Sequence, residues 1–333
     1  MPAPNPLRDF RVDRQAITYM GEGLVRPECI LAQADGTLWT CDARGGIARS
    51  DELGSKLIQV YEADSANVGL EAGHLPNGIA LMRDGSFIVA NLGNRSIDRI
   101  HDGKAETLYT HVDGKPLGTM NFVLRDSKDR IWFTVMTQTP DLLAAINDKA
   151  ADGYIGLIDE SGIRVVADDV SGANELRFDA DESHLYVVES FRLRVTRFSV
   201  GEQGQLTNRS RHGPEGLPVM PDGLAIDAAG NVWVSFIFAD RLIAITPEGK
   251  LLELLDDGDA AASAAIARAF EDGAITHELM GATGGTLSRW FTSVTFGGSD
   301  LRQVYIGSAL GSRLPSFRSP VAGVPPAHWN DPR

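Results

Sequence analysis

The chain has 333 residues and a formal net charge of -14, with 45 Asp and Glu against 31 Lys and Arg. This balance argues against nucleic acid as a partner, because a phosphate-binding surface needs clustered Lys and Arg. No stretch of about eighteen apolar residues occurs, so the sequence predicts no membrane-spanning helix.

Residues 1–6 contain no basic segment followed by an apolar one, and we therefore expect a cytoplasmic protein. The two cysteines, Cys29 and Cys41, are too few for a disulfide framework, and we expect both to be buried as small apolar side chains. The 35 Gly, the 16 Pro and many short runs of Val, Ile, Leu and Trp favour an all-β fold of regular hairpins. We expect a single domain over residues 1–333.

One pattern recurs along the chain: a polar residue, an apolar stretch, a turn with Asp or Gly, and a second strand centred on an aromatic or aliphatic residue. A repeat of about 40 to 50 residues is typical of propeller blades. The six instances run from Glu28 to Trp39, Asn77 to Ile88, Asn121 to Trp132, Asn174 to Tyr186, Asp222 to Trp233 and Ser293 to Tyr305.

The register of these repeats is nearly constant. The polar residue and the second-strand residue lie 11 positions apart in four instances and 12 in the other two. Successive second-strand residues are separated by 49, 44, 54, 47 and 72 positions, each enough for a four-stranded sheet. The pattern predicts a six-bladed β-propeller, with blades from about residue 20 to residue 325.

Two of the intervals contain helical patterns. Residues 137–153 include Pro140 followed by a short apolar run, and residues 257–273 are rich in alanine. We expect a short helix in each, inserted between strands on one face of the propeller, where it could cover the mouth of a pocket.

The polar residues that begin the repeats all carry a side-chain oxygen; they are Glu28, Asn77, Asn121, Asn174, Asp222 and Ser293. If each repeat starts with the innermost strand of a blade, these side chains converge on the central axis. Carboxylate and amide oxygens without thiolate or imidazole favour a hard cation such as Ca²⁺, Mg²⁺ or Mn²⁺. Taken singly, Asn77-Gly78 and Asp222-Gly223 are also common turn dipeptides, so a turn is the alternative for those two.

At these positions the chain resembles the superfamily of senescence marker protein (regucalcin), gluconolactonase and luciferin-regenerating enzyme. The matching stretches are Arg26-Pro27-Glu28-Cys29, Met120-Asn121-Phe122-Val123, Ala173-Asn174-Glu175-Leu176-Arg177-Phe178 and Met220-Pro221-Asp222-Gly223-Leu224-Ala225-Ile226-Asp227. The resemblance implies a six-bladed propeller with a divalent cation held by Glu28, Asn174 and Asp222. It implies that Asn121 contacts either the metal or the substrate. We expect Ca²⁺, with Mg²⁺, Mn²⁺ and Zn²⁺ as alternatives.

The chain departs from the resemblance in two places. Thr119 stands where the sugar-lactonase branch has Arg, and Val135-Met136 stand where many relatives continue with Asp. The candidate pocket walls are apolar, namely Phe122, Met136, Phe236 and Phe238. A less polar lactone or ester is therefore an alternative to a sugar lactone.

The first functional hypothesis is a metal-dependent lactonase that opens a small lactone ring. The cation would polarise the carbonyl, and Asp222 would assist attack by water as base, nucleophile or ligand. The residues predicted to contact substrate are Asn77, Thr119, Asn121, Glu175 and Ser293, with Glu175 also a second candidate base. His74 and His277 could line the pocket or satisfy loop hydrogen bonds. The alternatives are an esterase or phosphotriesterase, an isomerase at the same metal, and a non-enzymatic calcium-binding propeller.

Overall fold

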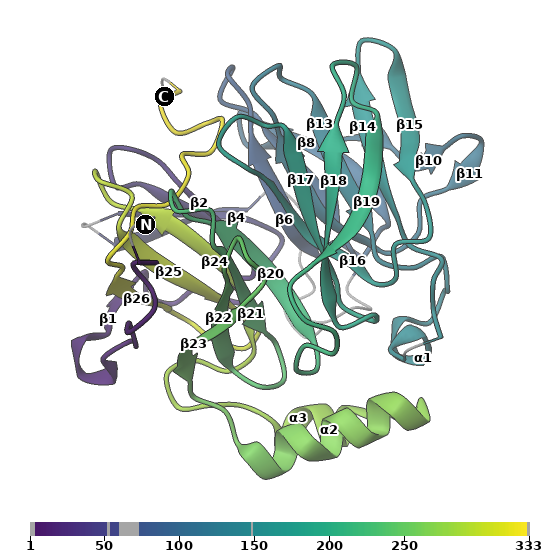
Figure 1. The fold of residues 1–333 in the computed structure, drawn as a ribbon. Coiled ribbons are helices and arrows are strands. Elements are labelled where there is room, and N and C mark those ends of the chain that lie inside the picture. Colours follow the sequence, from purple (N-terminus) through teal and green to yellow (C-terminus); the bar gives the residue numbers. More distant parts are fainter. Residues whose placement is uncertain (1–3, 52–53, 60–72, 148, 332–333) are drawn as a thin grey trace.

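The computed structural model describes residues 4–51, 54–59, 73–147 and 149–331 and consists mostly of strands. Six four-stranded antiparallel sheets are arranged around a common axis (Figure 1). The predicted six-bladed β-propeller is therefore confirmed. Within the described ranges, no helix has the length and apolar character needed to cross a membrane.

In five blades the strands follow the sequence from the axis outward. The first three blades contain β2 to β5 (Ile30–Ala32, Leu38–Asp42, Gly46–Asp51, Gly54–Gln59), β6 to β9 (Pro76–Leu81, Phe87–Asn91, Ser96–His101, Lys104–Tyr109) and β12 to β15 (Met120–Arg125, Ile131–Val135, Tyr154–Asp159, Gly162–Ala167). The next two contain β16 to β19 (Ala173–Phe178, His184–Glu189, Arg194–Val200, Leu206–His212) and β20 to β23 (Pro221–Ile226, Val232–Phe236, Arg241–Ile245, Leu251–Asp256). A short hairpin, β10 (His111–Val112) and β11 (Lys115–Pro116), lies between the second and third blades in the sequence.

The ring is closed by pairing of the two ends of the chain. The sixth blade contains β24 (Phe291–Gly297), β25 (Gln303–Ser308), β26 (Leu314–Arg318) and, as its outer strand, β1 (Thr18–Met20), which follows the 3-10 helix η1 (Arg14–Ala16). Each inner strand contacts the inner strands of both neighbouring blades, including β24 with β2. Closure of this kind leaves few exposed sheet edges. The repeat pattern does not predict β1, because three residues are too few to show alternation.

The second-strand residues predicted from the repeat all lie in the second strand of a blade. In two blades the buried indole of this residue donates a hydrogen bond to the Asp of the preceding turn. Trp132 donates to Asp126 and Trp233 to Asp227, each at 2.9 Å. The Asp and the Trp of the repeat are therefore direct partners, which fixes the turn against the blade.

The two cysteines are free thiols in the core. Burial raises the pKa of both Cys29 and Cys41 well above the ordinary thiol value. The prediction that they act as small apolar residues is confirmed, since a buried and protonated thiol is chemically inert.

Close packing of neighbouring inner strands requires glycine at two positions. A Cβ on Gly78 would lie 2.6 Å from the Cα of Phe122 in the next blade. A Cβ on Gly223 would lie 2.3 Å from the carbonyl oxygen of Thr292. Both dipeptides, Asn77-Gly78 and Asp222-Gly223, lie within strands, so the turn interpretation is wrong for them.

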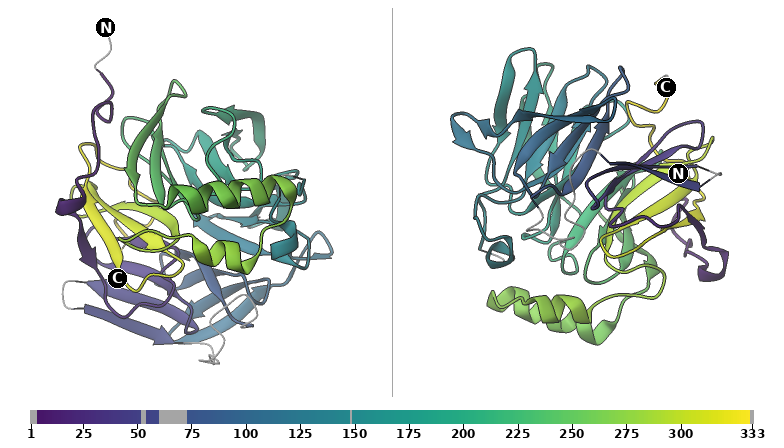
Figure 2. Two further views of the ribbon diagram at one scale, coloured as in Figure 1. Left: turned by 90° about the horizontal axis from the view of Figure 1, so that it is seen from below. Right: turned by 180° about the vertical axis from the view of Figure 1, so that it is seen from behind.

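Three helices gather on one face of the propeller (Figures 1 and 2). They are α1 (Leu142–Ala145), α2 (Ala260–Asp272) and α3 (His277–Ala282). The first two fall in the predicted insertions, which are confirmed as helical, whereas α3 is too short to show a helical period. The carboxylate of Asp259 caps the start of α2, and Gly273, with φ 65°, ends it. Apolar side chains of all three helices join those of the blades beneath in one cluster.

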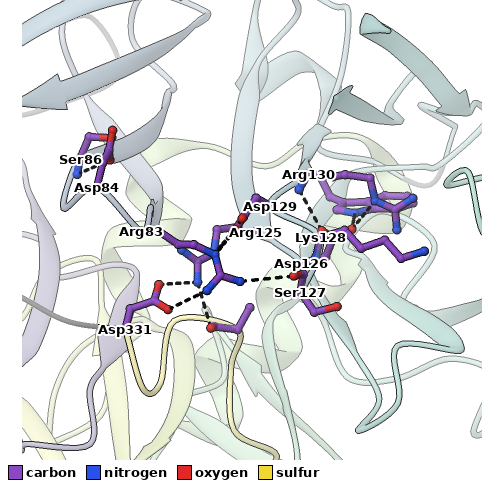
Figure 3. Close-up of polar contacts among 12 residues, drawn as sticks. Arg83, Asp84, Ser86, Arg125, Asp126, Ser127, Lys128, Asp129, Arg130 and Asp331 are labelled. Carbon is purple, nitrogen blue, oxygen red and sulfur yellow. Dashed lines mark hydrogen bonds and ion pairs between the residues drawn. The ribbon is translucent and has the colours of Figure 1, made fainter. Parts of the chain in front are cut away.

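The C-terminal segment crosses the opposite face (Figure 1). The carboxylate of Asp331 faces two guanidinium groups, with 2.5 Å to Arg125 and 3.7 Å to Arg83 (Figure 3). Arg125 also donates to the carbonyl of Ala327 at 2.9 Å. The buried imidazole of His328 lies 3.2 Å from the carbonyl oxygen of Ala32. These contacts tie the chain end to the first three blades.

The fold should lose stability in acid through His328. Burial, together with the nearby Arg125, lowers the pKa of His328 to about 4. A histidine whose pKa is lowered in the folded state binds its proton more readily in the unfolded chain. Its contribution to the free energy of unfolding is therefore fully present above pH ~6.5 and is lost as the pH falls toward ~4. We expect the stability difference between wild type and His328→Gln to shrink by ~2 kcal/mol between pH 7 and 4.5.

Urea unfolding at the two pH values measures this difference. His101→Gln, at the exposed histidine that ends β8, serves as the control and should show no such change. A difference between wild type and His328→Gln that does not vary with pH would contradict the assignment.

Candidate functional site

A cavity of about 620 Å³ opens on the face covered by the helices. Its floor receives one polar side chain from each blade: Glu28, Asn77, Asn121, Asn174, Asp222 and Thr292. Five of these six are the residues predicted from the repeat. Side chains separated by up to 264 positions in the sequence therefore meet at the axis.

The register of the inner strands explains this convergence. Each of the six residues stands three positions before the residue that pairs with the second-strand anchor, as Asp222 does before Ala225, the partner of Trp233. In five blades the pairing shifts register at the polar residue. Such a β-bulge turns a side chain out of the regular alternation and is common beside functional sites. In the first blade, Glu28 instead precedes the short strand β2.

In the sixth blade the floor position predicted for Ser293 is occupied by its neighbour Thr292. The anchor Tyr305 pairs with Thr295, and three positions before Thr295 is Thr292. Counting back from the second strand assumed a turn of nearly constant length, and the turn of this blade is longer. Ser293 is buried and does not appear among the described residues that line the cavity.

Three of the floor oxygens are buried with no hydrogen-bond donor among the described residues: Oε2 of Glu28, Oδ1 of Asn121 and Oδ1 of Asn174. Buried acceptors are almost always paired, so unpaired ones call for an explanation such as an ion. Together with the Asp222 carboxylate they form an all-oxygen set with two negative charges, which fits a hard divalent cation. In the part of the chain that the structure describes, no three His, Cys, Asp or Glu form a metal-binding group, because half of this set is amide.

Asn77 differs from the other floor residues because its amide is fully engaged. Its Nδ2 donates to Oε1 of Glu28 at 3.1 Å and to the carbonyl of Asn121 at 2.9 Å. Its Oδ1 accepts a hydrogen bond from Arg26 at 2.6 Å. Asn77 therefore orients the Glu28 carboxylate and holds a guanidinium beside its own oxygen, and this positive charge disfavours a cation at that atom.

Burial and nearby carboxylates raise the pKa of the acids at the floor. Burial raises the pKa of Asp222 to about 8, and the charge of Glu175 adds to the effect. Burial also raises the pKa of Glu28 well above its ordinary value, where Arg26 opposes the shift and Asp222 adds to it. A bound cation reverses this logic, since it favours the ionised forms. The site is thus built at an electrostatic cost that positive charge relieves.

Two further residues predicted to contact substrate lie behind the floor. Glu175 accepts a hydrogen bond from the amide of Leu224 at 3.2 Å and pairs with Arg177 at 3.0 Å. It follows Asn174 in the bulge, so its side chain points into the neighbouring blade. Thr119 precedes β12 and exchanges backbone hydrogen bonds with residues 136 and 137. Neither Glu175 nor Thr119 is among the described residues that line the cavity.

The walls of the cavity are apolar. Of the four predicted wall residues, Met136 and Phe238 line it, whereas Phe122 and Phe236 are buried within the blades. The helices add Leu142 and Leu143 from α1 and Met280 from α3, and Trp290 completes the wall. The sequence predicted α1 but not α3, and it contained no signal for which of their side chains face inward. Of the two histidines considered, His277 lines the cavity, and His74 contacts Asn94 at 2.8 Å.

Comparison with known proteins identifies the chain's relatives. The family model described as the SMP-30/Gluconolactonase/LRE-like region matches residues 21–270. The chain is 25% identical over 266 residues to 6-deoxy-6-sulfogluconolactonase of Pseudomonas putida, covering 79% of each chain. It is 24% identical over 240 residues to regucalcin of Xenopus laevis, covering 69% of this chain and 78% of that one.

Among solved structures, the calcium-binding protein regucalcin of Agrobacterium tumefaciens superimposes with a TM-score of 0.64 at 12% identity. The match covers 92% of this chain and 95% of that one. At this identity the likeness concerns the fold, and it agrees with the six-bladed propeller.

Cation binding should depend on the two floor carboxylates. We expect isothermal titration of the metal-free protein with Ca²⁺ to give one site. Glu28→Gln or Asp222→Asn should raise the dissociation constant for Ca²⁺ by more than the ~10- to 100-fold typical of outer-shell changes. The exposed acid Glu160 provides the matched control, Glu160→Gln. If Glu28→Gln, folded by circular dichroism, bound Ca²⁺ as tightly as wild type, the ligand set would be wrong.

Asn77 should act on the cation through Glu28. Asn77→Ala removes the hydrogen bond that orients this carboxylate and should weaken Ca²⁺ binding by about 10-fold, the size expected for an outer-shell partner. Asn330→Ala, at an exposed position on the opposite face, should leave it unchanged. Undiminished Ca²⁺ affinity in Asn77→Ala would show that Glu28 needs no such support.

Proposed function

Because the chain belongs to the SMP-30/gluconolactonase/LRE-like family, we propose that it is a divalent-metal-dependent lactonase. Relatives named as lactonases support a lactone-hydrolysing activity. The metal dependence, the ligand set and the role of Asp222 are parts of this proposal. Its substrate is a small molecule that enters the cavity beneath the helices.

One observation carries the proposal: a two-carboxylate, two-amide oxygen set with buried, unpaired acceptors lies at the floor of a deep cavity. A cation with only a structural role needs no access to a cavity. If the floor had only a structural role and held no ion, its buried acceptor oxygens would be paired with hydrogen-bond donors. An open site beside a pocket is the arrangement that catalytic metals require.

The proposed ligands are Glu28, Asn121, Asn174 and Asp222. We take Ca²⁺ as the cation, a choice supported by the calcium-binding relative and by the hard oxygen set. When bound, the cation supplies Lewis-acid polarisation of the lactone carbonyl. Arg26, at the edge of the floor, contributes a second positive charge toward the oxygen on which negative charge develops.

Hydrolysis then needs a group that handles one proton. Water attacks the carbonyl carbon, the ring carbon–oxygen bond breaks, and the water proton passes to the ring oxygen to give a hydroxy acid. We assign that proton to Asp222, because Asn77 holds Oε1 of Glu28 in a fixed orientation and Glu175 is paired with Arg177 behind the floor. Transfer by a positioned side chain contributes roughly 100- to 10,000-fold to such reactions.

The activity should require both the cation and Asp222. A pH-indicator assay on aliphatic, aromatic and sugar lactones should show turnover that EDTA abolishes and Ca²⁺ restores while the fold persists. At saturating Ca²⁺, Asp222→Asn should lower kcat by about 100- to 10,000-fold, and Glu160→Gln should retain wild-type activity. Turnover insensitive to EDTA, or unchanged in Asp222→Asn, would contradict the mechanism. Loss of folding with EDTA, without lactone turnover, would favour a non-enzymatic calcium-binding propeller.

A further inference from the structure

Among the described residues, few hydrogen-bonding side chains line the cavity above the floor. Apart from the floor residues and Arg26, only His277 and Ser312 present polar side chains among the described residues that line it, if the indole of Trp290 is set aside. His277 is exposed at the rim, at the start of α3. Substrate hydroxyl groups held away from the floor would therefore have few partners.

The aromatic wall offers no donor either. The indole Nε1 of Trp290 donates to the hydroxyl of Thr283 at 2.9 Å, so its only polar atom is already used. The ring packs edge to face against Phe238, with centroids 5.3 Å apart and an interplanar angle of 87°. This pair presents a rigid apolar surface to the cavity.

The helices add apolar side chains that are only partly buried. Leu142 and Leu143 of α1 and Met280 of α3 are each intermediate in exposure and line the cavity. They lie on two separate insertions that cover the same face (Figure 2). Their remaining exposed surface is best buried by an apolar ligand. A polar ligand would either leave this hydrocarbon exposed to water or bury its own polar groups without partners.

Resting on the proposed function, we propose that the substrate is a lactone whose non-reacting part is an alkyl or aryl group, held between α1, α3 and the Phe238–Trp290 wall. The volume of about 620 Å³ suits a ligand larger than a bare lactone ring. The ring oxygen and carbonyl face the floor, where most of the polar side chains among the described lining residues are gathered. A polyhydroxylated lactone is a poor substrate, because each buried hydroxyl without a partner opposes binding.

A series of δ-lactones that differ only in their side chain tests this selectivity. From δ-valerolactone through δ-hexalactone and δ-octalactone to δ-decalactone, kcat/KM should rise by about fourfold per methylene, which corresponds to ~0.8 kcal/mol. Glucono-δ-lactone has the carbon skeleton of δ-hexalactone with four added hydroxyls. After each rate is divided by the uncatalysed rate in the same buffer, glucono-δ-lactone should be the worse substrate. A flat series, or preference for glucono-δ-lactone, overturns the inference.

Binding separates this inference from the proposed chemistry. Lactams with the same rings and side chains resist hydrolysis, and their affinities, measured by calorimetry, should rise along the same series. Chain-dependent lactam binding without any lactone turnover would refute the lactonase and retain the apolar site. Lactone turnover with no chain dependence in either assay would retain the lactonase and refute the apolar site.

Substitution of the half-buried apolar side chains tests their role directly. Leu142→Asn combined with Met280→Asn should flatten the dependence of lactam affinity on chain length. Leu251 is an exposed leucine on the outer strand β23, 42% exposed, so Leu251→Asn is the matched control and should keep the full dependence. Met280→Trp should shorten the longest side chain that is accepted. An unaltered dependence in both substituted proteins would place the substrate elsewhere in the cavity.

Discussion

Three oxygen atoms in three different blades are buried at the axis with no hydrogen-bond donor among the described residues, and the candidate site depends on this arrangement. Each unpaired acceptor costs on the order of 1–3 kcal/mol, and a carboxylate costs more. The cost recurs in Glu28, Asn121 and Asn174 and is increased by the neighbouring Asp222. Positive charge at the axis relieves it. A region that concentrates unfavourable electrostatics at the floor of a cavity is where binding energy becomes available for chemistry.

The scaffold holds these oxygens in place by backbone geometry. The register shifts of the inner strands turn the polar side chains to the axis, and Gly78 and Gly223 let adjacent inner strands approach to a distance that no larger residue permits. Asn77 then orients Glu28 from the neighbouring blade. The helices contribute on the other side of the cavity, where most of the side chains that they add to the lining are apolar. Polarity at the floor and hydrocarbon above it come from different parts of the chain.

Much of this could be predicted from the sequence because the repeat records the register. A polar residue followed at 11 or 12 positions by a strand anchor located six inner strands and five of the six floor residues. The prediction failed where the spacing of residues in the sequence does not determine the direction of a side chain. A longer turn displaced the sixth position from Ser293 to Thr292, and Glu175 is turned away from the cavity although it adjoins Asn174. The short elements β1 and α3 form through tertiary contacts, so local periodicity does not reveal them.

The outer strand of the sixth blade has a consequence for how the protein is made. Residues 18–20 are synthesised before their partner strand, residues 314–318, which follows only after the other five blades have been made. The earlier blades can stack as they emerge, whereas the circle is completed only once residues 314–318 are available to pair with β1. Since the floor draws one side chain from every blade, the emerging chain has no finished pocket until then. During synthesis the blades therefore form first, and the cavity can bind a ligand only afterwards.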